Sequence, residues 1–163
     1  MKKVVKFGGS SLASAEQFMK VGAIIRADES RRYVVPSAPG KRFSDDTKVT
    51  DMLYHCYELA EQSKAFNKQL NQIKDRYNEI INGLKLDFSL DEDFEIIKKQ
   101  FVAKAGSMYA ASRGEYLNGK IMAKYLGYEF VDAANVIRFN KDGSFDSETT
   151  NEPVSYTHLR AHE

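Results

Sequence analysis

The first part of the chain switches between two spacings of apolar residues. Residues 3–7 and 33–35 are short apolar runs that each predict a buried strand, and the second run ends at Pro36, which cannot donate to a β-ladder. Between them, apolar residues recur at helical spacing after Ser14 and Gln17, a pair with the spacing of a capping box. Strand, helix and strand in this order predict a parallel βαβ unit with a right-handed crossover.

Residues 45–104 have helical spacing throughout. The first helix of this segment is expected to begin between residues 45 and 47, and the second ends at the stop signal Asn82-Gly83. Ser89 and Glu92 have the spacing of a second capping box and mark the third helix. The charged residues between the apolar positions are expected to form a solvated face. So long a helical segment between strands is unusual for a plain doubly wound sheet.

The last part of the chain, from residue 107 onward, predicts one helix followed by short strands. A helix is expected over residues 107–126 and ends at Gly127. A third strand is expected over residues 128–131, a short fourth strand over residues 136–139, and a turn over residues 141–144. The predicted fold class is α/β, with a mainly parallel sheet flanked by helices.

The residues after the first strand suit an anion such as phosphate. They are Lys6, Phe7, Gly8, Gly9, Ser10 and Ser11. Glycines let backbone N–H groups approach a ligand closely, the serine hydroxyls add donors, and a helix that starts just afterwards points its positive end at the same place. The alternative is an ordinary strand-to-helix turn with a solvated lysine.

The loop over residues 37–47 follows the second strand and therefore lies at the same edge of the sheet, where such folds bind ligands. Its small, polar and charged residues, Lys41 and Arg42 among them, fit a lid or substrate loop as well as a plain surface loop. Thr50 and Asp51 fall in the first turn of the next helix, where free backbone donors bind small anions.

Gly114 interrupts the helix expected over residues 107–126, at a cost of about 1 kcal/mol relative to alanine. Either a packing contact requires a glycine here, or the glycine lets a ligand or a neighbouring backbone come close while Glu115 reaches into the site. The pattern alone favours the packing contact slightly.

Charge and composition narrow the possible functions. The 163 residues carry a net charge of +1, which gives no sign of a nucleic-acid surface. The chain has a single cysteine, Cys56, so an intramolecular disulfide is excluded. Because Cys56 lies on an apolar helical stripe, we expect it to be a buried core residue. His55 lies off that stripe and is expected at the surface. The amino-terminal apolar run is too short for a signal peptide or a membrane span, so a cytoplasmic location is expected.

Three motifs together resemble the aspartate kinases of the amino acid kinase family. Residues 4–12 read Val-Val-Lys-Phe-Gly-Gly-Ser-Ser-Leu and match the amino-terminal signature of that family throughout. Thr50-Asp51 resembles its Thr-Asn pair, and residues 112–115 resemble its Ser-x-Gly-Glu motif. The resemblance covers roughly residues 1–150, and the loop over residues 37–42 resembles a clostridial-type variant.

The resemblance implies a truncated three-layer α/β/α sandwich of the carbamate kinase-like type. It also implies transfer of the γ-phosphoryl group of ATP, which carries Mg²⁺, to the β-carboxylate of L-aspartate. Lys6 would be the catalytic residue that neutralises the phosphates, and residues 6–11 would cradle them. Thr50 and Ser37 would bind aspartate, and Glu115 would bind its ammonium group. The resemblance assigns no metal ligand, nucleic acid or membrane to the chain, and implies that the whole enzyme is a homo-oligomer.

The chain also departs from the family pattern. Asp51 replaces the usual Asn and adds a negative charge near an anionic substrate. The charge has no effect on the substrate if the Asp51 side chain faces away from it. The sequence lacks the family's later Gly-Arg-Gly-Gly-Ser-Asp motif, which supplies a catalytic aspartate and much of the nucleotide pocket, and its regulatory ACT domains. Residues 1–151 therefore correspond to the amino-terminal part of the catalytic domain, and we expect them to be inactive alone. The alternatives are another amino-acid kinase, acting on glutamate or acetylglutamate, or a non-catalytic binding protein built on a degenerate kinase half.

Residues 152–163 share no resemblance with the family and have no clear periodicity. They resemble translated sequencing adapter, so we expect a non-native tail. His158 and His162 have the i, i+4 spacing that binds a metal on a helix, but the non-native tail is the favoured interpretation.

Overall fold

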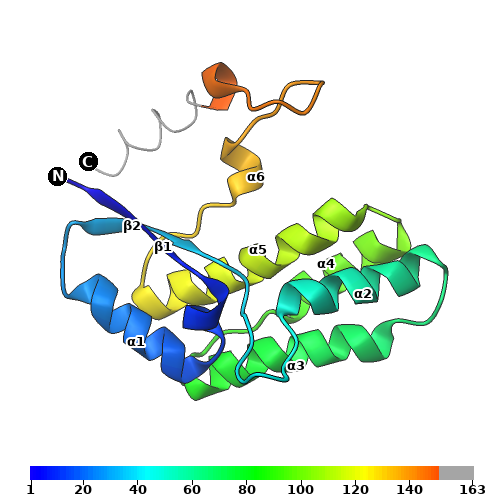
Figure 1. Cartoon of the computed structure of the whole chain (residues 1–163), viewed down its shortest axis with the longest axis horizontal. Coiled ribbons are helices and arrows are strands. Elements are labelled where there is room, and N and C mark those ends of the chain that lie inside the picture. Colours follow the sequence, from blue (N-terminus) through cyan, green and yellow to red (C-terminus); the bar gives the residue numbers. More distant parts are fainter. Residues whose placement is uncertain (151–163) are drawn as a thin grey trace. The chain divides into compact units, whose positions relative to one another are not determined.

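The computed structural model describes residues 1–150 and divides the chain into two compact units, residues 1–129 and a smaller unit that begins at Phe130. Figure 1 shows the elements. In chain order the first unit contains β1 (Lys3–Phe7), the 3₁₀ helix η1 (Gly9–Leu12), α1 (Ala15–Arg26), β2 (Arg31–Pro36), α2 (Val49–Glu61), α3 (Asn67–Gly83), α4 (Asp91–Val102) and α5 (Ser107–Leu126). The second unit contains α6 (Ala133–Val136).

The two strands pair in parallel, as the βαβ pattern predicted. Val5 lies opposite Val34, and both pack with Phe7 against the apolar core. Val4 and Val35 lie on the other face of the sheet and are 68% and 47% exposed. The prediction of buried strands is therefore wrong for this face, because the helices of the unit pack on the opposite one.

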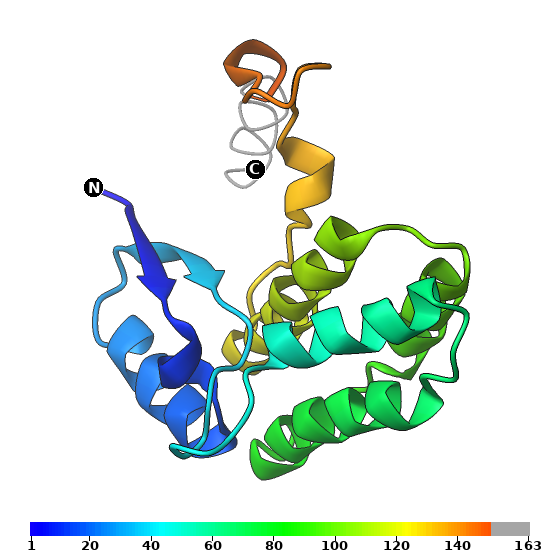
Figure 2. The same ribbon diagram turned by 45° about the vertical axis from the view of Figure 1, so that its right-hand side comes forward.

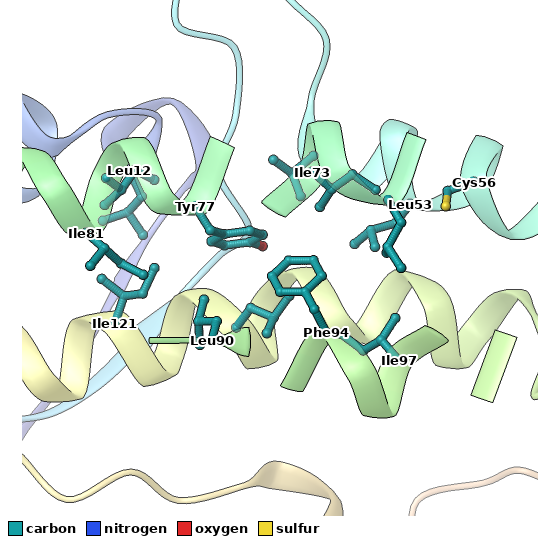
Figure 3. Close-up of a cluster of buried hydrophobic side chains, with 14 of the residues drawn as sticks. Leu12, Leu53, Cys56, Ile73, Tyr77, Ile81, Leu90, Phe94, Ile97 and Ile121 are labelled. Atoms are coloured by element: carbon teal, nitrogen blue, oxygen red, sulfur yellow. The ribbon is translucent and has the colours of Figure 1, made fainter. Parts of the chain in front are cut away.

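Helices α1 to α5 enclose one apolar core (Figures 1 and 2). Helix α5 packs against α2, α4 and β2, so the helical segment α2–α4 reaches the sheet through α5. In the close-up of the core, the Tyr77 ring points toward the Phe94 ring, and their centroids are 6.2 Å apart (Figure 3). Cys56 is fully buried, as predicted, and His55 is exposed, also as predicted.

The helix starts agree with the predictions at α1 and differ at α2 and α4. Ser14 caps α1 by accepting a hydrogen bond from the Gln17 N–H across 3.3 Å, which confirms the first capping box. The second capping box is wrong: α4 begins after Leu90, and Ser89 Oγ accepts instead from the Asp91 N–H. Because residues 42–46 close a turn of their own, α2 begins at Val49, later than expected.

The expected third and fourth strands do not form. Residues 128–131 are irregular, residues 133–136 form α6, and Phe139 pairs only in an isolated bridge with Phe145. A strand needs a neighbouring strand for its backbone groups, and among the described residues the sheet consists of β1 and β2 alone. Gly127 does end α5 in the left-handed conformation, with φ of 71°, as predicted.

Residues 141–144 form the predicted turn. The predicted tail, residues 152–163 with His158 and His162, lies outside the described residues. None of the helices in residues 1–150 is long and apolar enough to span a membrane.

Candidate functional site

The glycine turn (residues 6–11) touches the β2–α2 loop (residues 37–48) backbone to backbone. The Gly40 N–H donates to the Gly9 carbonyl oxygen across 2.8 Å. A Cβ atom on Gly40 would lie 2.6 Å from the Gly9 carbonyl carbon, and one on Gly9 would lie 2.9 Å from the Ala38 carbonyl oxygen. Both positions therefore require glycine, because no side chain fits between the two segments.

Gly8 differs from Gly9 in its surroundings. A Cβ atom on Gly8 would meet no atom within 4 Å, and its φ of −78° suits any residue. The close approach of a ligand to the backbone, which the sequence predicted for both glycines, has open space at Gly8, whereas Gly9 serves the contact with the loop. The helix expected just after the turn is the short η1, and α1 begins only at Ala15.

Lys6 lies on β1 opposite Val35, on the sheet face that carries the exposed Val4. The residue is exposed, and its ammonium group has no ion-pair partner among residues 1–150. A charged group without a counter-ion at the start of the glycine turn remains available to an anion. Ser10 is also exposed, while Ser11 is half-buried and donates its N–H to the Gly8 carbonyl oxygen across 3.1 Å.

Helix α5 meets the β2–α2 loop at Gly114. A Cβ atom on Gly114 would lie 2.7 Å from Ala38 Cβ and 3.8 Å from Thr50 Oγ1. The packing interpretation of this glycine is therefore confirmed. The same contact brings the first turn of α2, which holds Thr50, next to the turn of α5 that holds Glu115.

Thr50 is half-buried in the first turn of α2, as predicted. No side chain caps this helix, and the Val49 N–H donates to the Pro39 carbonyl oxygen across 3.1 Å. The next N–H groups, of Thr50 and Asp51, have no hydrogen-bond acceptor among the described residues. Free donors at the start of a helix of this length suit an anion, through the helix dipole and through direct hydrogen bonding, so the predicted binding at Thr50 stays a prediction.

Asp51 faces a different place from Thr50. It lines a groove of about 510 Å³ between α2 and α3, together with His55 and Arg76. Thr50 instead approaches Gly114 on the side of α5. The extra carboxylate thus points away from the contact between α2 and α5.

Glu115 is exposed on α5, one residue beyond Gly114. Burial raises the pKa of the Tyr77 hydroxyl well above its usual range, and the nearby Glu115 carboxylate adds to this effect. Glu115 directly follows Gly114, whose carbonyl oxygen accepts a hydrogen bond from the Tyr77 hydroxyl where α3 meets α5. In residues 1–150, no three His, Cys, Asp or Glu side chains gather closely enough to hold a metal ion.

Asn118 is a site residue that the sequence patterns missed. It is fully buried one turn beyond Gly114, and its Nδ2 donates to the Ser37 carbonyl oxygen across 2.7 Å. The Ser37 N–H in turn donates to the Phe7 carbonyl oxygen across 3.0 Å. The available signal was a polar residue on the apolar stripe of a helix, between Leu117 and Ile121.

The sequence model of the amino acid kinase family matches residues 1–160. The chain belongs to the amino acid kinase family. It is 39% identical over 140 residues to aspartokinase 3 of Bacillus subtilis (strain 168), in an alignment that covers 82% of this chain and 31% of that protein. It is 31% identical over 104 residues to the bifunctional aspartokinase/homoserine dehydrogenase of Buchnera aphidicola, in an alignment that covers 61% of this chain and 12% of that protein. The chain thus spans less than a third of the length of these curated relatives.

Solved aspartate kinases share the fold. The structure of Clostridium acetobutylicum aspartate kinase superposes with a TM-score of 0.92 at 48% identity, over 98% of this chain and 37% of that one. Escherichia coli aspartokinase III, solved with aspartate and ADP, superposes with a TM-score of 0.77 at 21% identity, over 99% of this chain and 38% of that one. These similarities confirm the α/β fold of the family and the resemblance to aspartate kinases that the three motifs predicted.

Proposed function

We propose that this chain is the amino-terminal part of an aspartate kinase, which transfers the γ-phosphoryl group of ATP to the β-carboxylate of L-aspartate. The product, 4-phospho-L-aspartate, would enter lysine, threonine and methionine biosynthesis. The observation that carries the proposal is the contact of three segments at Gly9, Gly40 and Gly114. It brings the turn that follows Lys6 beside the helix start at Thr50. The similarity to aspartokinases supports the choice of reaction.

The glycine turn is the proposed nucleotide half of the site. Lys6 supplies a positive charge without a counter-ion among the described residues, and the open space at Gly8 admits phosphate oxygens to the backbone. Phe7, Gly9, Ser10 and Ser11 complete the proposed cradle. Carboxylates are already nucleophilic at neutral pH, so the reaction needs no strong base. Catalysis rests on positioning and on stabilising the charge of the transferred phosphoryl group.

The start of α2 and the middle of α5 form the proposed aspartate half. The free N–H groups at Thr50 and Asp51 suit a carboxylate of the substrate, and the Thr50 hydroxyl adds a donor. The exposed carboxylate of Glu115 suits its ammonium group. Ser37, which Asn118 holds at the end of β2, is the third proposed contact with aspartate.

Mg²⁺ would arrive with ATP and offset phosphate charge. A cytoplasmic location and a homo-oligomeric whole enzyme stay predictions. So does the inactivity of residues 1–151 alone, since the missing family motif supplies part of the nucleotide pocket. Aspartyl hydroxamate formed by residues 1–151 would contradict that inactivity.

The test of the function uses the full-length protein that carries this chain, assayed by trapping aspartyl phosphate with hydroxylamine. Lys6→Met is expected to lower kcat by roughly 100-fold or more, since it removes charge stabilisation of the transferred group. Glu115→Gln is expected to raise KM for aspartate far more than KM for ATP. Lys3→Met is the matched control, because Lys3 lies on the same strand and forms only an exposed pair with Asp28.

Competing substrates separate the alternatives. Glutamate or N-acetylglutamate used more efficiently than aspartate would indicate another amino-acid kinase. A non-catalytic protein would show no phosphoryl transfer to any of the three, and Lys6→Met would leave its binding of an ATP analogue unchanged. Either result would overturn the proposed function.

A further inference from the structure

Arg76 of α3 ties the two ends of the β2–α2 loop together. Its Nη2 donates to the Gly40 carbonyl oxygen across 2.9 Å, and its Nη1 donates to the Thr47 carbonyl oxygen across 2.9 Å. The same Nη1 lies 3.4 Å from Asp46 Oδ2. The residue is only 5% exposed, although the sequence pattern placed it on a solvated helix face. That expectation is wrong, because the loop covers this side of α3.

A second arginine fixes the tip of the same loop. Arg42 forms a bidentate pair with Asp46, with Nε to Oδ2 at 2.7 Å and Nη2 to Oδ1 at 3.0 Å. Its Nη1 also donates to Glu79 Oε2 on α3 across 2.9 Å. The hydrogen bonds from Arg42, with the charge of Arg76 nearby, hold the pKa of Asp46 well below its usual range. Asp46 is thus a carboxylate shared by two guanidinium groups, which is a strong and geometrically specific arrangement.

The loop that Arg76 holds also connects the two halves of the proposed site. Gly40 accepts from Arg76 with its carbonyl oxygen and donates to Gly9 of the glycine turn with its N–H. Pro39, its neighbour, accepts from the Val49 N–H at the start of α2. A shift of Gly40 would therefore move the glycine turn relative to the first turn of α2.

We propose that Arg76 is a positioning residue, which locks the β2–α2 loop so that the glycine turn and the start of α2 keep a fixed separation. We call its contacts with Gly40, Asp46 and Thr47 the Arg76 latch. The loop is then neither a free lid nor a plain surface loop. The catalytic consequence rests on the proposed function, whereas the latch itself does not.

Hydrogen exchange on this chain tests the latch without any activity. Arg76→Met removes every donor of the latch and leaves the two carbonyl oxygens and Asp46 without this partner. Exchange of the Gly40 and Val49 amides is expected to rise roughly 10- to 100-fold more than exchange of the Leu117 amide in the core of α5. Arg76→Lys restores the charge but not the fork of donors, so the rise should be smaller.

Lys120→Met is the matched control, because it breaks a partly buried 2.7 Å ion pair with Asp93 that lies between α5 and α4. It should not raise exchange at Gly40 and Val49 above that at Leu117. Equal acceleration of all three amides in Arg76→Met, or none, would overturn the latch. If Arg76→Met does not fold, Arg76→Lys takes its place, since it loses the fork that reaches both carbonyl oxygens and should still raise exchange at Gly40 and Val49 above that at Leu117.

Kinetics of the full-length enzyme test the catalytic consequence. Because each substrate binds its own half of the site, Arg76→Lys is expected to lower kcat by roughly 10- to 100-fold and to leave both KM values within about threefold. An unchanged kcat in the folded variant would overturn the positioning role. An enzyme without aspartate kinase activity would overturn the proposed function instead, and the exchange measurement would still decide the latch.

Discussion

The hydroxyl of Tyr77 donates a hydrogen bond to the carbonyl oxygen of Gly114 across 2.8 Å, in a fully buried position. This bond joins α3 to the turn of α5 that precedes Glu115. On another side of the same glycine, Ala38 packs too closely for a side chain. Gly114 of α5 is therefore contacted both by α3 and by the β2–α2 loop.

Tyr77→Phe removes this hydroxyl and little else. The free energy of unfolding is expected to fall by about 1–2 kcal/mol, because the buried Gly114 carbonyl oxygen loses this side-chain partner. Urea denaturation measures the loss. Tyr54→Phe, at a 43% exposed position, should change stability by less than about 0.5 kcal/mol. Similar losses in the two variants would contradict the role given to the Tyr77 hydroxyl.

Gly9→Ala and Gly8→Ala should differ sharply although the residues are neighbours. A Cβ atom on Gly9 would press on the Ala38 carbonyl oxygen at 2.9 Å and on Gly40 at 3.2 Å, so we expect a loss of roughly 1–3 kcal/mol in the free energy of unfolding. Gly8 has open space and a negative φ, and its variant should keep nearly full stability. Thermal melting of both variants decides this, and equal melting temperatures would contradict the contact.

Gly114→Ala tests two opposing effects in one helix. Alanine gains about 1 kcal/mol of helix propensity, but its Cβ would lie 2.7 Å from Ala38 Cβ, and overpacking of that kind costs about 1–3 kcal/mol. We expect a net loss of stability by urea denaturation. Adding Ala38→Gly removes the opposing methyl group and should restore part of the loss. A double variant no more stable than Gly114→Ala would show that another contact causes the strain.

The thiol of Cys56 should be unreactive in the folded protein. Burial raises its pKa to about 12, so the thiolate is scarce at pH 8, and the side chain is fully buried. Labelling with a chromogenic disulfide reagent at pH 8 is expected to proceed only as fast as the protein unfolds. Labelling of the native protein at the rate of a free cysteine peptide would be the contrary result.

The same thiol gives a pH dependence with a definite sign. Its pKa is lower in the unfolded chain, about 9, than in the folded protein, about 12, so the unfolded state releases the proton first. The contribution of Cys56 to stability is therefore complete below about pH 9 and declines as the pH rises toward 12. The stability difference between the wild type and Cys56→Ala should shrink over this range.

The helices were predictable because their apolar faces are long and regular. The helix over residues 107–126 has the predicted bounds, and the first strand was also placed correctly. The strands expected over residues 128–131 and 136–139 do not form. The residue types that favour a strand can be read from a short stretch of sequence. A strand forms only where a neighbouring strand satisfies its backbone groups, and the short stretch does not show whether such a neighbour exists.

The candidate site divides in the same way. The glycine turn, Thr50 and Gly114 were found from short motifs, because turn and helix-start chemistry is written in adjacent residues. Arg76 and Asn118 were missed, because their partners lie 36 and 81 residues away along the chain. A charged residue on α3 and an amide on α5 acquire their roles only when the β2–α2 loop packs on them.

The long separation between Ser37 and Asn118 also has a consequence for synthesis of the protein. β1 and β2 pair at short range, so both strands of the amino-terminal βαβ unit leave the ribosome well before α5. The Ser37 carbonyl must wait for a partner 81 residues later, which at roughly 5–20 residues per second amounts to about 4–16 seconds. During that interval the nascent chain lacks α5, so the apolar residues that this helix covers in the finished fold are exposed.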